Sequence, residues 1–93
     1  LLDFNQPAVD LDRRIRAMNP WPGAWFEWEG APFKIHKAHM GQGKAEAGKR
    51  LVEQNQPAVG TGSGILILDE VQPPGKKPMN GKSFLAGARN WLD

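Results

Sequence analysis

The stretch of this sequence closest to a known catalytic motif is "GKKPMNGKS", residues 75–83, which follows strand-like residues and precedes helix-like ones. In a P-loop at such a place, backbone amides and a lysine hold phosphates, and four residues separate the two glycines. Here five residues separate Gly75 from Gly81, and Pro78 lacks the amide that a phosphate cradle uses. The chain is also too short for the sheet on which such loops sit. We therefore exclude a nucleotide-hydrolysing function.

The two histidines, His36 and His39, are three residues apart on strand-like sequence, so they would face opposite sides of a sheet. No third ligand is evident beside them, and the chain has no cysteine. The glycine-rich residues 60–64 lead into a strand, whereas a pyrophosphate is held at the N-terminus of a helix. No serine, histidine and acid stand out as a triad. We expect no catalytic residue, no cofactor site and no metal site in this chain.

Eleven residues, "MNPWPGAWFEW" at 18–28, hold three of the four tryptophans and two prolines. Such a stretch is either a platform on which a ligand stacks or the corner where a helix gives way to a sheet. Large aromatic side chains anchor a small core because each of them buries so much area. We therefore predict that Trp21, Phe26 and Trp28 are buried and that the stretch is a structural corner.

Trp25 lies on the other face of the same predicted strand, where a flat ring is able to stack on a base. Glu27 and Glu29 share that face and would repel a phosphate backbone. We expect Trp25 to pack instead against a helix or a neighbouring domain.

The elements that position these residues follow from periodicity and turn signals. Asn5 is a predicted N-cap with Pro7 in the first turn, and apolar residues then recur at helical spacing up to Met18. Asn19-Pro20 ends this helix, since a residue before proline avoids the α region. Asn80 caps a second helix, whose apolar stripe consists of Phe84, Leu85, Ala88, Trp91 and Leu92. We expect strands at 24–29, 33–40, 50–54, 57–61 and 65–72, turns at 30–32 and 62–64, and a polar loop at 41–49.

A helix, five short strands and a second helix predict a β-rich α+β fold. Five antiparallel strands in 93 residues favour a small, partly closed barrel flanked by an N-terminal and a C-terminal helix, because closure removes exposed edges. Residues 1–93 then form one domain, and the start at Leu1 rather than methionine indicates a fragment of a longer chain. The longest apolar run, 65–68, is too short to span a membrane, and the lack of cysteine fits a reducing cytoplasm.

The charge is unevenly distributed although the net charge is only +2. Residues 1–33 carry five acids and three arginines, and residues 34–50 carry five bases and one acid. Residues 51–75 have three acids and no base, and residues 76–93 have four bases and one acid. Two basic segments separated by an acidic one either meet in space as a patch for a polyanion or form an ordinary solvated surface.

Two motifs resemble a known family. "DFNQPAVDLDRRIRAMNPWPGAWF", residues 3–26, is similar to the opening of the C-terminal domain of methionyl-tRNA formyltransferases, with a Trp-Pro-Gly corner after an Ile-Arg-Ala helix. "VQPPGKKPMNGKSFLAGA", residues 71–88, is similar to the closing segment of that domain. The two motifs occur in the right order and at suitable spacing, whereas residues 41–63 match in outline only.

The resemblance implies an OB-fold-like barrel and a share in tRNA binding. In this family, an N-terminal domain that these residues do not include transfers formyl from 10-formyltetrahydrofolate to initiator methionyl-tRNA. The C-terminal domain holds the tRNA by phosphate contacts, so we expect tRNA and the N-terminal catalytic domain as partners, a monomer, and a cytoplasmic location. The RNA-binding candidates, chosen by charge, are Lys34 and Lys37 on the second strand, Lys76 and Lys77 beyond the last strand, and Lys82 on the final helix.

Other interpretations remain open. Arg13, Arg14 and Arg16 rank below the lysines because Asp10 and Asp12 lie close in the sequence. The same domain type follows formyltransferase domains that act on folate or on sugar nucleotides, although the corner Asn-Pro-Trp-Pro favours the tRNA enzyme. A third interpretation is a structural domain that docks on a catalytic domain through the face carrying Trp25.

Overall fold

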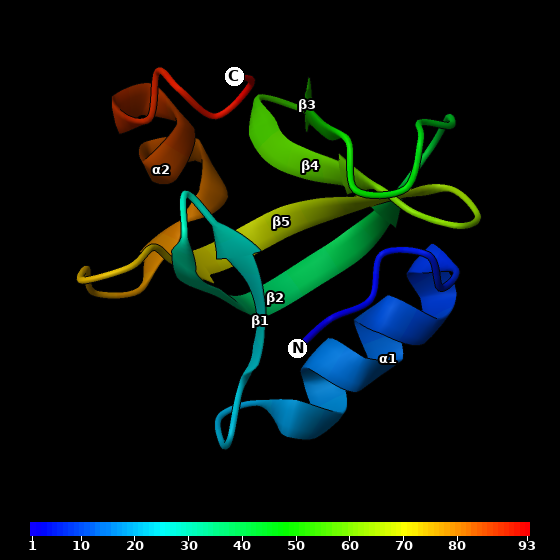
Figure 1. The fold of residues 1–93 in the computed structure, drawn as a ribbon, viewed down its shortest axis with the longest axis horizontal. Helices are drawn as coiled ribbons and strands as arrows, with labels where there is room; N and C mark the ends of the chain where they lie inside the picture. The colour runs from blue at the N-terminus through cyan, green and yellow to red at the C-terminus, as the bar shows by residue number, and fades with distance from the viewer.

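Two helices and six strands make up the fold of residues 1–93, all of which are described by a computed structural model (Figure 1). The two helices pack on different parts of the sheet, α1 mainly on β2 and α2 on β4 and β5. The β-rich α+β class predicted from the sequence is confirmed. The elements are α1 Ala8–Met18, β1 Ala24–Trp28, β2 Ala31–Gly41, β3 Arg50–Glu53, β4 Gln56–Gly60, β5 Ile65–Gln72, β6 Met79–Asn80 and α2 Gly81–Gly87.

The sheet is antiparallel throughout, with the strand order β1-β2-β5-β4-β3 and with β6 paired to β5. The long strands β2 and β5 form its centre, and Figure 1 shows α1 and α2 on opposite sides of this pair. The five predicted strands are all present. The sixth, β6, was not predicted, because two residues show no periodicity. No pairing joins β1 to β3, so the barrel is open between these two edges.

Helix α1 begins one residue after Pro7, which occupies the N-cap position without a side-chain cap. The predicted cap, Asn5, is wrong: its backbone N–H and its side-chain amide both donate to Asp3 Oδ1 at 3.0 Å, which forms a turn before the helix. Leu11 and Ile15 are fully buried on the predicted apolar face. The helix ends at Met18 as predicted, and Asn19 is extended ahead of Pro20.

The hairpin between β1 and β2 turns on only two residues. Glu29 and Gly30 both have positive φ angles, 53° and 77°, as tight hairpin turns require. Ala31 therefore already pairs with Trp28, and the predicted three-residue turn at 30–32 is too long. The early start of β2 brings Lys34 opposite Trp25 across the hairpin.

The Trp-Pro-Gly corner joins α1 to β1 and is closed by a hydrogen bond from Gly23 N–H to Met18 O at 2.8 Å. Phe26 and Trp28 are buried behind it, as predicted from the alternation along the strand. The predicted burial of Trp21 is wrong, because 82% of its surface is exposed. The corner is therefore structural at its strand end and solvent-facing at its tip.

The C-terminal segment begins as predicted and then departs from the helix. Asn80 caps α2, its Oδ1 accepting a hydrogen bond from Ser83 N–H at 2.7 Å. The helix ends at Gly87, so Trp91 and Leu92 do not continue its apolar stripe. Trp91 is nevertheless buried, to 1% exposure, because the turn after α2 leads the chain back over the sheet, whereas Leu92 is exposed.

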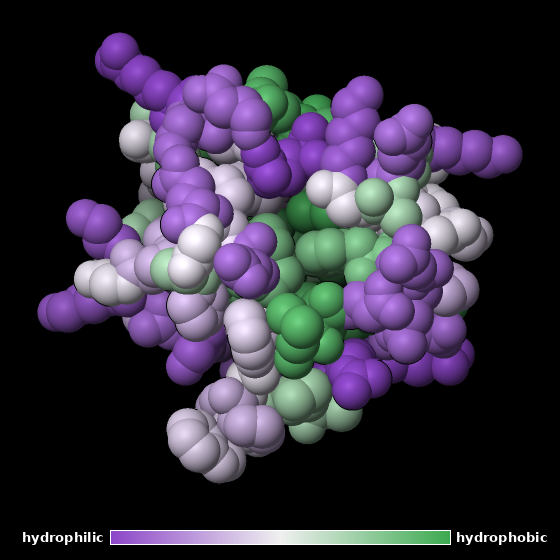
Figure 2. All heavy atoms as spheres, in the orientation of Figure 1, coloured by the Kyte–Doolittle hydropathy of each residue, from purple (hydrophilic) through white to green (hydrophobic).

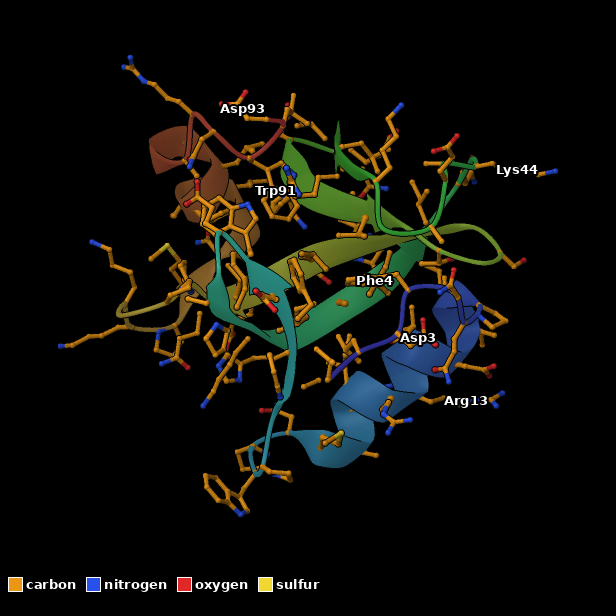
Figure 3. All side chains as sticks on the ribbon, in the orientation of Figure 1. Asp3, Phe4, Arg13, Lys44, Trp91 and Asp93 are labelled. Carbon is orange, nitrogen blue, oxygen red and sulfur yellow. The ribbon has the colours of Figure 1, made fainter.

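Five aromatic side chains form the centre of the core. Their ring centroids are 5.0 to 6.3 Å apart in the contacting pairs, mostly in edge-to-face geometry. Trp91 completes the cluster by contacting β1 and by donating from Nε1 to Leu51 O of β3 at 3.0 Å, so it bridges the open edges of the sheet (Figure 3). The cluster consists of Phe26, Trp28, Phe33, Phe84 and Trp91.

Candidate nucleic-acid interface

The five candidate lysines come from three neighbouring elements, and together we call them the lysine surface. Strand β2 carries two of them, the loop between β5 and β6 carries two more, and the first turn of α2 carries the fifth. Lys34 is half-buried and the other four are exposed. The lysine surface consists of Lys34, Lys37, Lys76, Lys77 and Lys82.

Two surface hollows place Lys34 and Lys76 on either side of the same dipeptide, Pro73-Pro74. The larger hollow, about 560 Å³, has Lys76 in its wall, and the smaller, about 240 Å³, has Lys34. Both include the two prolines, so residues 42 positions apart in the sequence meet around one short ridge. Lys34 of one basic segment and Lys76 of the other therefore both lie beside this dipeptide.

Gln72, at the end of β5, ties the β5–β6 loop to β2. It lies opposite Lys34 in the β2–β5 pairing, and its Nε2 donates to Lys76 O at 3.1 Å. Its Oε1 accepts from His36 Nε2 at 2.9 Å, and this acceptor assigns the proton of the imidazole to Nε2. The backbone at Lys76 is thus fixed relative to Lys34. Sequence patterns do not reveal Gln72, because a cross-strand side-chain bond depends on the pairing register.

The charges of the lysine surface are free of ion pairs. None of its five lysines pairs with a carboxylate, whereas Arg13 lies 3.8 Å from Asp10 and Arg16 lies 3.4 Å from Asp12. This difference supports ranking the lysines above the helix arginines. Lys37 is the least favourable member for binding an anion, because its partner residue across the β2–β5 strand pair is the acid Glu70, although the two form no ion pair.

Other basic residues lie elsewhere or have structural contacts. Lys44 projects from the loop after β2, at the opposite end of the molecule from the β5–β6 loop (Figure 3). Arg50 donates from Nε to Trp91 O at 2.6 Å and packs its guanidinium 5.8 Å from the Trp91 ring. The basic segment 34–50 is therefore divided, and its Lys34 lines a hollow together with residues at the start of the β5–β6 loop.

Figure 2 shows that the polar side chains of the β5–β6 loop project from one edge of the molecule. Apolar side chains gather in the middle of the face in view, over the N-terminal segment, where Leu1 is exposed. The part of the lysine surface that the β5–β6 loop carries therefore lies at an edge of the domain, beside the Pro73-Pro74 ridge.

The two histidines have separate partners. His36 contacts Gln72 and Asn19, whereas His39 Nδ1 lies 2.8 Å from Asp69 Oδ2. This hydrogen bond raises the pKa of His39 above its ordinary value, and partial burial opposes the shift. No three metal-ligating side chains cluster in the structure. Neither α1 nor α2 has the length and apolar character needed to cross a bilayer.

Comparison with known proteins identifies what this arrangement is similar to. The family model described as "Formyl transferase, C-terminal domain" matches residues 1–89. The methionyl-tRNA formyltransferase of Thiobacillus denitrificans is 48% identical over 90 residues, covering 92% of this chain and 29% of the relative. That of Streptococcus gordonii is 43% identical over 88 residues, covering 94% and 28%. That of Roseiflexus castenholzii is 40% identical over 92 residues, covering 96% and 29%. The chain thus spans less than a third of the length of these relatives.

Proposed function

This chain belongs to the formyl transferase C-terminal domain family, and we propose that it holds initiator methionyl-tRNA through the lysine surface. A separate N-terminal domain of the longer protein then transfers formyl to the methionyl group from 10-formyltetrahydrofolate. This chain contributes no catalytic side chain and holds no cofactor of its own. The protein acts in the cytoplasm, as a monomer, in the initiation of translation.

One observation carries the tRNA-binding proposal: Lys34 and Lys76 flank the Pro73-Pro74 ridge with no carboxylate partner. Gln72 joins β2 to the β5–β6 loop, because its amide oxygen accepts from His36 and its amide nitrogen donates to Lys76 O. A polyanion gains most from cations that are not already neutralised and whose backbone is ordered before binding. The relatives act on a methionyl-tRNA by their names, which makes an RNA phosphate backbone the polyanion of choice.

The contacts proposed here are to phosphates, so affinity depends on salt. If about four lysines each neutralise one phosphate, the logarithm of the binding constant falls with the logarithm of salt concentration at a slope of roughly −3. The affinity is similar for different tRNAs, because phosphate contacts carry no sequence information.

The test measures tRNA affinity at several salt concentrations for the wild type and for two charge-matched double variants. Lys76→Gln with Lys77→Gln is expected to weaken binding to all tRNAs and to flatten the slope by about two units, one for each lost contact. Arg13→Gln with Arg16→Gln removes the same charge but is expected to change the slope little, because Asp10 and Asp12 already offset these arginines.

An affinity independent of salt, or a Lys76/Lys77 double variant that binds as tightly as the wild type, would contradict the lysine surface. The alternative is then a C-terminal domain of a formyltransferase that acts on folate or a sugar nucleotide, in which this chain docks on the catalytic domain and binds no nucleic acid.

A further inference from the structure

Trp21 is the one tryptophan whose side chain is exposed to solvent. Its exposure is 82%, whereas Trp28 and Trp91 are buried and Trp25 is half-buried. Exposing a ring of this size forgoes the burial that stabilises a small domain. The Trp21 ring therefore contributes little to the packing of the domain and is accessible to a partner.

The corner that carries Trp21 holds the side chain on a restrained backbone. Prolines precede and follow it, and each proline fixes its own φ angle. The Gly23 N–H to Met18 O bond closes the base of the corner at 2.8 Å. Little backbone freedom is therefore lost when a partner covers the ring.

The base of the corner adjoins the lysine surface at Lys34. A methyl group placed on Gly23 would lie 4.0 Å from Cδ of Lys34, which is contact distance. Residues 18–26 contain no acid, and the nearest acid along β1, Glu27, pairs with Pro32 rather than with Lys34. The base of the corner that carries the exposed ring therefore adjoins an unpaired cation, and residues 18–26 include no carboxylate.

We propose that Trp21 stacks on an unpaired base of the bound tRNA while the lysine surface holds the adjoining phosphates. This inference rests on the proposed function and adds a contact to the RNA that involves no charge. An aromatic ring beside cations is the arrangement that binds single-stranded nucleic acid, because the ring takes a base and the cations take the backbone. Every base has a π face, so one stacking ring adds affinity without reading sequence.

The occupant is a nucleic acid rather than a protein surface because of the charge around the ring. A protein partner that buried Trp21 and reached the base of the corner at Gly23 would also cover Lys34, and an unpaired buried cation is costly. An RNA supplies the phosphate for Lys34 and the flat base for Trp21 together.

The test compares Trp21→Ala, Trp21→Phe and Met40→Ala in tRNA binding at several salt concentrations. Trp21→Ala is expected to weaken binding by between about 5-fold and about 150-fold, with the same salt slope as the wild type because no charge is removed. Trp21→Phe retains most of the affinity. Met40 is half exposed at the end of β2, the strand that carries Lys34 near its beginning. Met40→Ala is therefore the control for losing an exposed apolar side chain away from the corner.

Two further measurements separate the possible outcomes. An RNA duplex without unpaired nucleotides is expected to bind Trp21→Ala and the wild type equally, because its bases are already stacked. Bound tRNA should also protect the wild type, but not Trp21→Phe, from part of the fluorescence quenching by acrylamide, since Trp21 is the most exposed indole.

Salt-dependent tRNA binding that is the same in Trp21→Ala and the wild type overturns the stacking contact and leaves the lysine surface intact. Unchanged tRNA binding together with weaker association between Trp21→Ala and the N-terminal domain assigns the ring to a protein interface instead. A wild-type chain that does not bind tRNA at all overturns the proposed function, and the stacking contact with it.

Discussion

Two buried tryptophans in one aromatic cluster differ in the hydrogen bonding of their indole N–H groups, and phenylalanine substitutions should expose that difference. Trp91 Nε1 donates to Leu51 O at 3.0 Å, whereas Trp28 Nε1 is buried and has no partner. Both rings are more than nine-tenths buried, at 1% and 8% exposure, and both contact Phe33 and Phe84. Replacing either by phenylalanine removes a similar apolar volume, so that loss largely cancels in the comparison.

The polar contributions have opposite signs. Trp91→Phe loses a hydrogen bond with a net value of about 0.5 to 1.5 kcal/mol. Trp28→Phe removes a buried, unpaired N–H group, whose burial costs about 1 to 3 kcal/mol. Trp91→Phe should therefore lower the free energy of unfolding by about 1.5 to 4.5 kcal/mol more than Trp28→Phe does. Such a difference is a large part of the 5 to 15 kcal/mol or so that stabilises a typical domain.

Urea denaturation followed by far-ultraviolet circular dichroism is the suitable assay, because tryptophan fluorescence itself changes in these variants. A slope of about 1 to 3 kcal/mol per molar urea converts the expected difference into midpoints separated by roughly 0.5 M or more. Equal losses of stability in the two variants would refute the assigned hydrogen-bond pattern, as would a larger loss in Trp28→Phe.

Three further predictions concern the core, a helix cap and a titrating pair. Trp28→Ala should lower the free energy of unfolding by roughly 3 to 5 kcal/mol, while Trp21→Ala, being exposed, should leave the urea midpoint nearly unchanged. Asn80→Ala should cost about 1 kcal/mol in the same assay, since Ser83 N–H loses its acceptor, and Asn80→Ser should restore most of it. The pKa of His39 lies above its ordinary value of 6.5 in the folded chain, so its stabilising contribution is complete below pH 6.5 and is lost as pH rises through the raised value. An NMR titration in which Asp69→Asn leaves the pKa of His39 unchanged would contradict this pairing.

Periodicity and turn residues were sufficient for most of the fold. Alternation along β1 correctly assigned Phe26 and Trp28 to the core, because a strand places every second side chain on one face. Proline after Asn19 and the capping side chain of Asn80 correctly located the end of one helix and the start of the other. These signals lie within a few residues of the element that they predict, so they do not depend on how distant parts of the chain fold.

The failures occur where position depends on the path of the backbone. Trp21 was assigned to the core from the size of its ring, but the corner directs it outward between two prolines. Arg50 was one of the five bases counted in residues 34–50, whereas the fold places it against Trp91, 41 residues later. The link between Lys34 and Lys76 through Gln72 depends on a register with two irregularities between Ile35 and Ala38, which no local pattern predicts.

The bridge that Trp91 forms between β1 and β3 also has a kinetic consequence. The β1–β2 and β3–β4 hairpins join residues close in the sequence, whereas the bond from Trp91 to Leu51 closes a loop of 40 residues. Contacts between residues far apart in the sequence cost more loop-closure entropy, so they form late when local structure forms first. We expect substitutions at Trp91 to accelerate unfolding in chevron measurements and to change the folding rate little, so that this side chain governs how long the folded state persists.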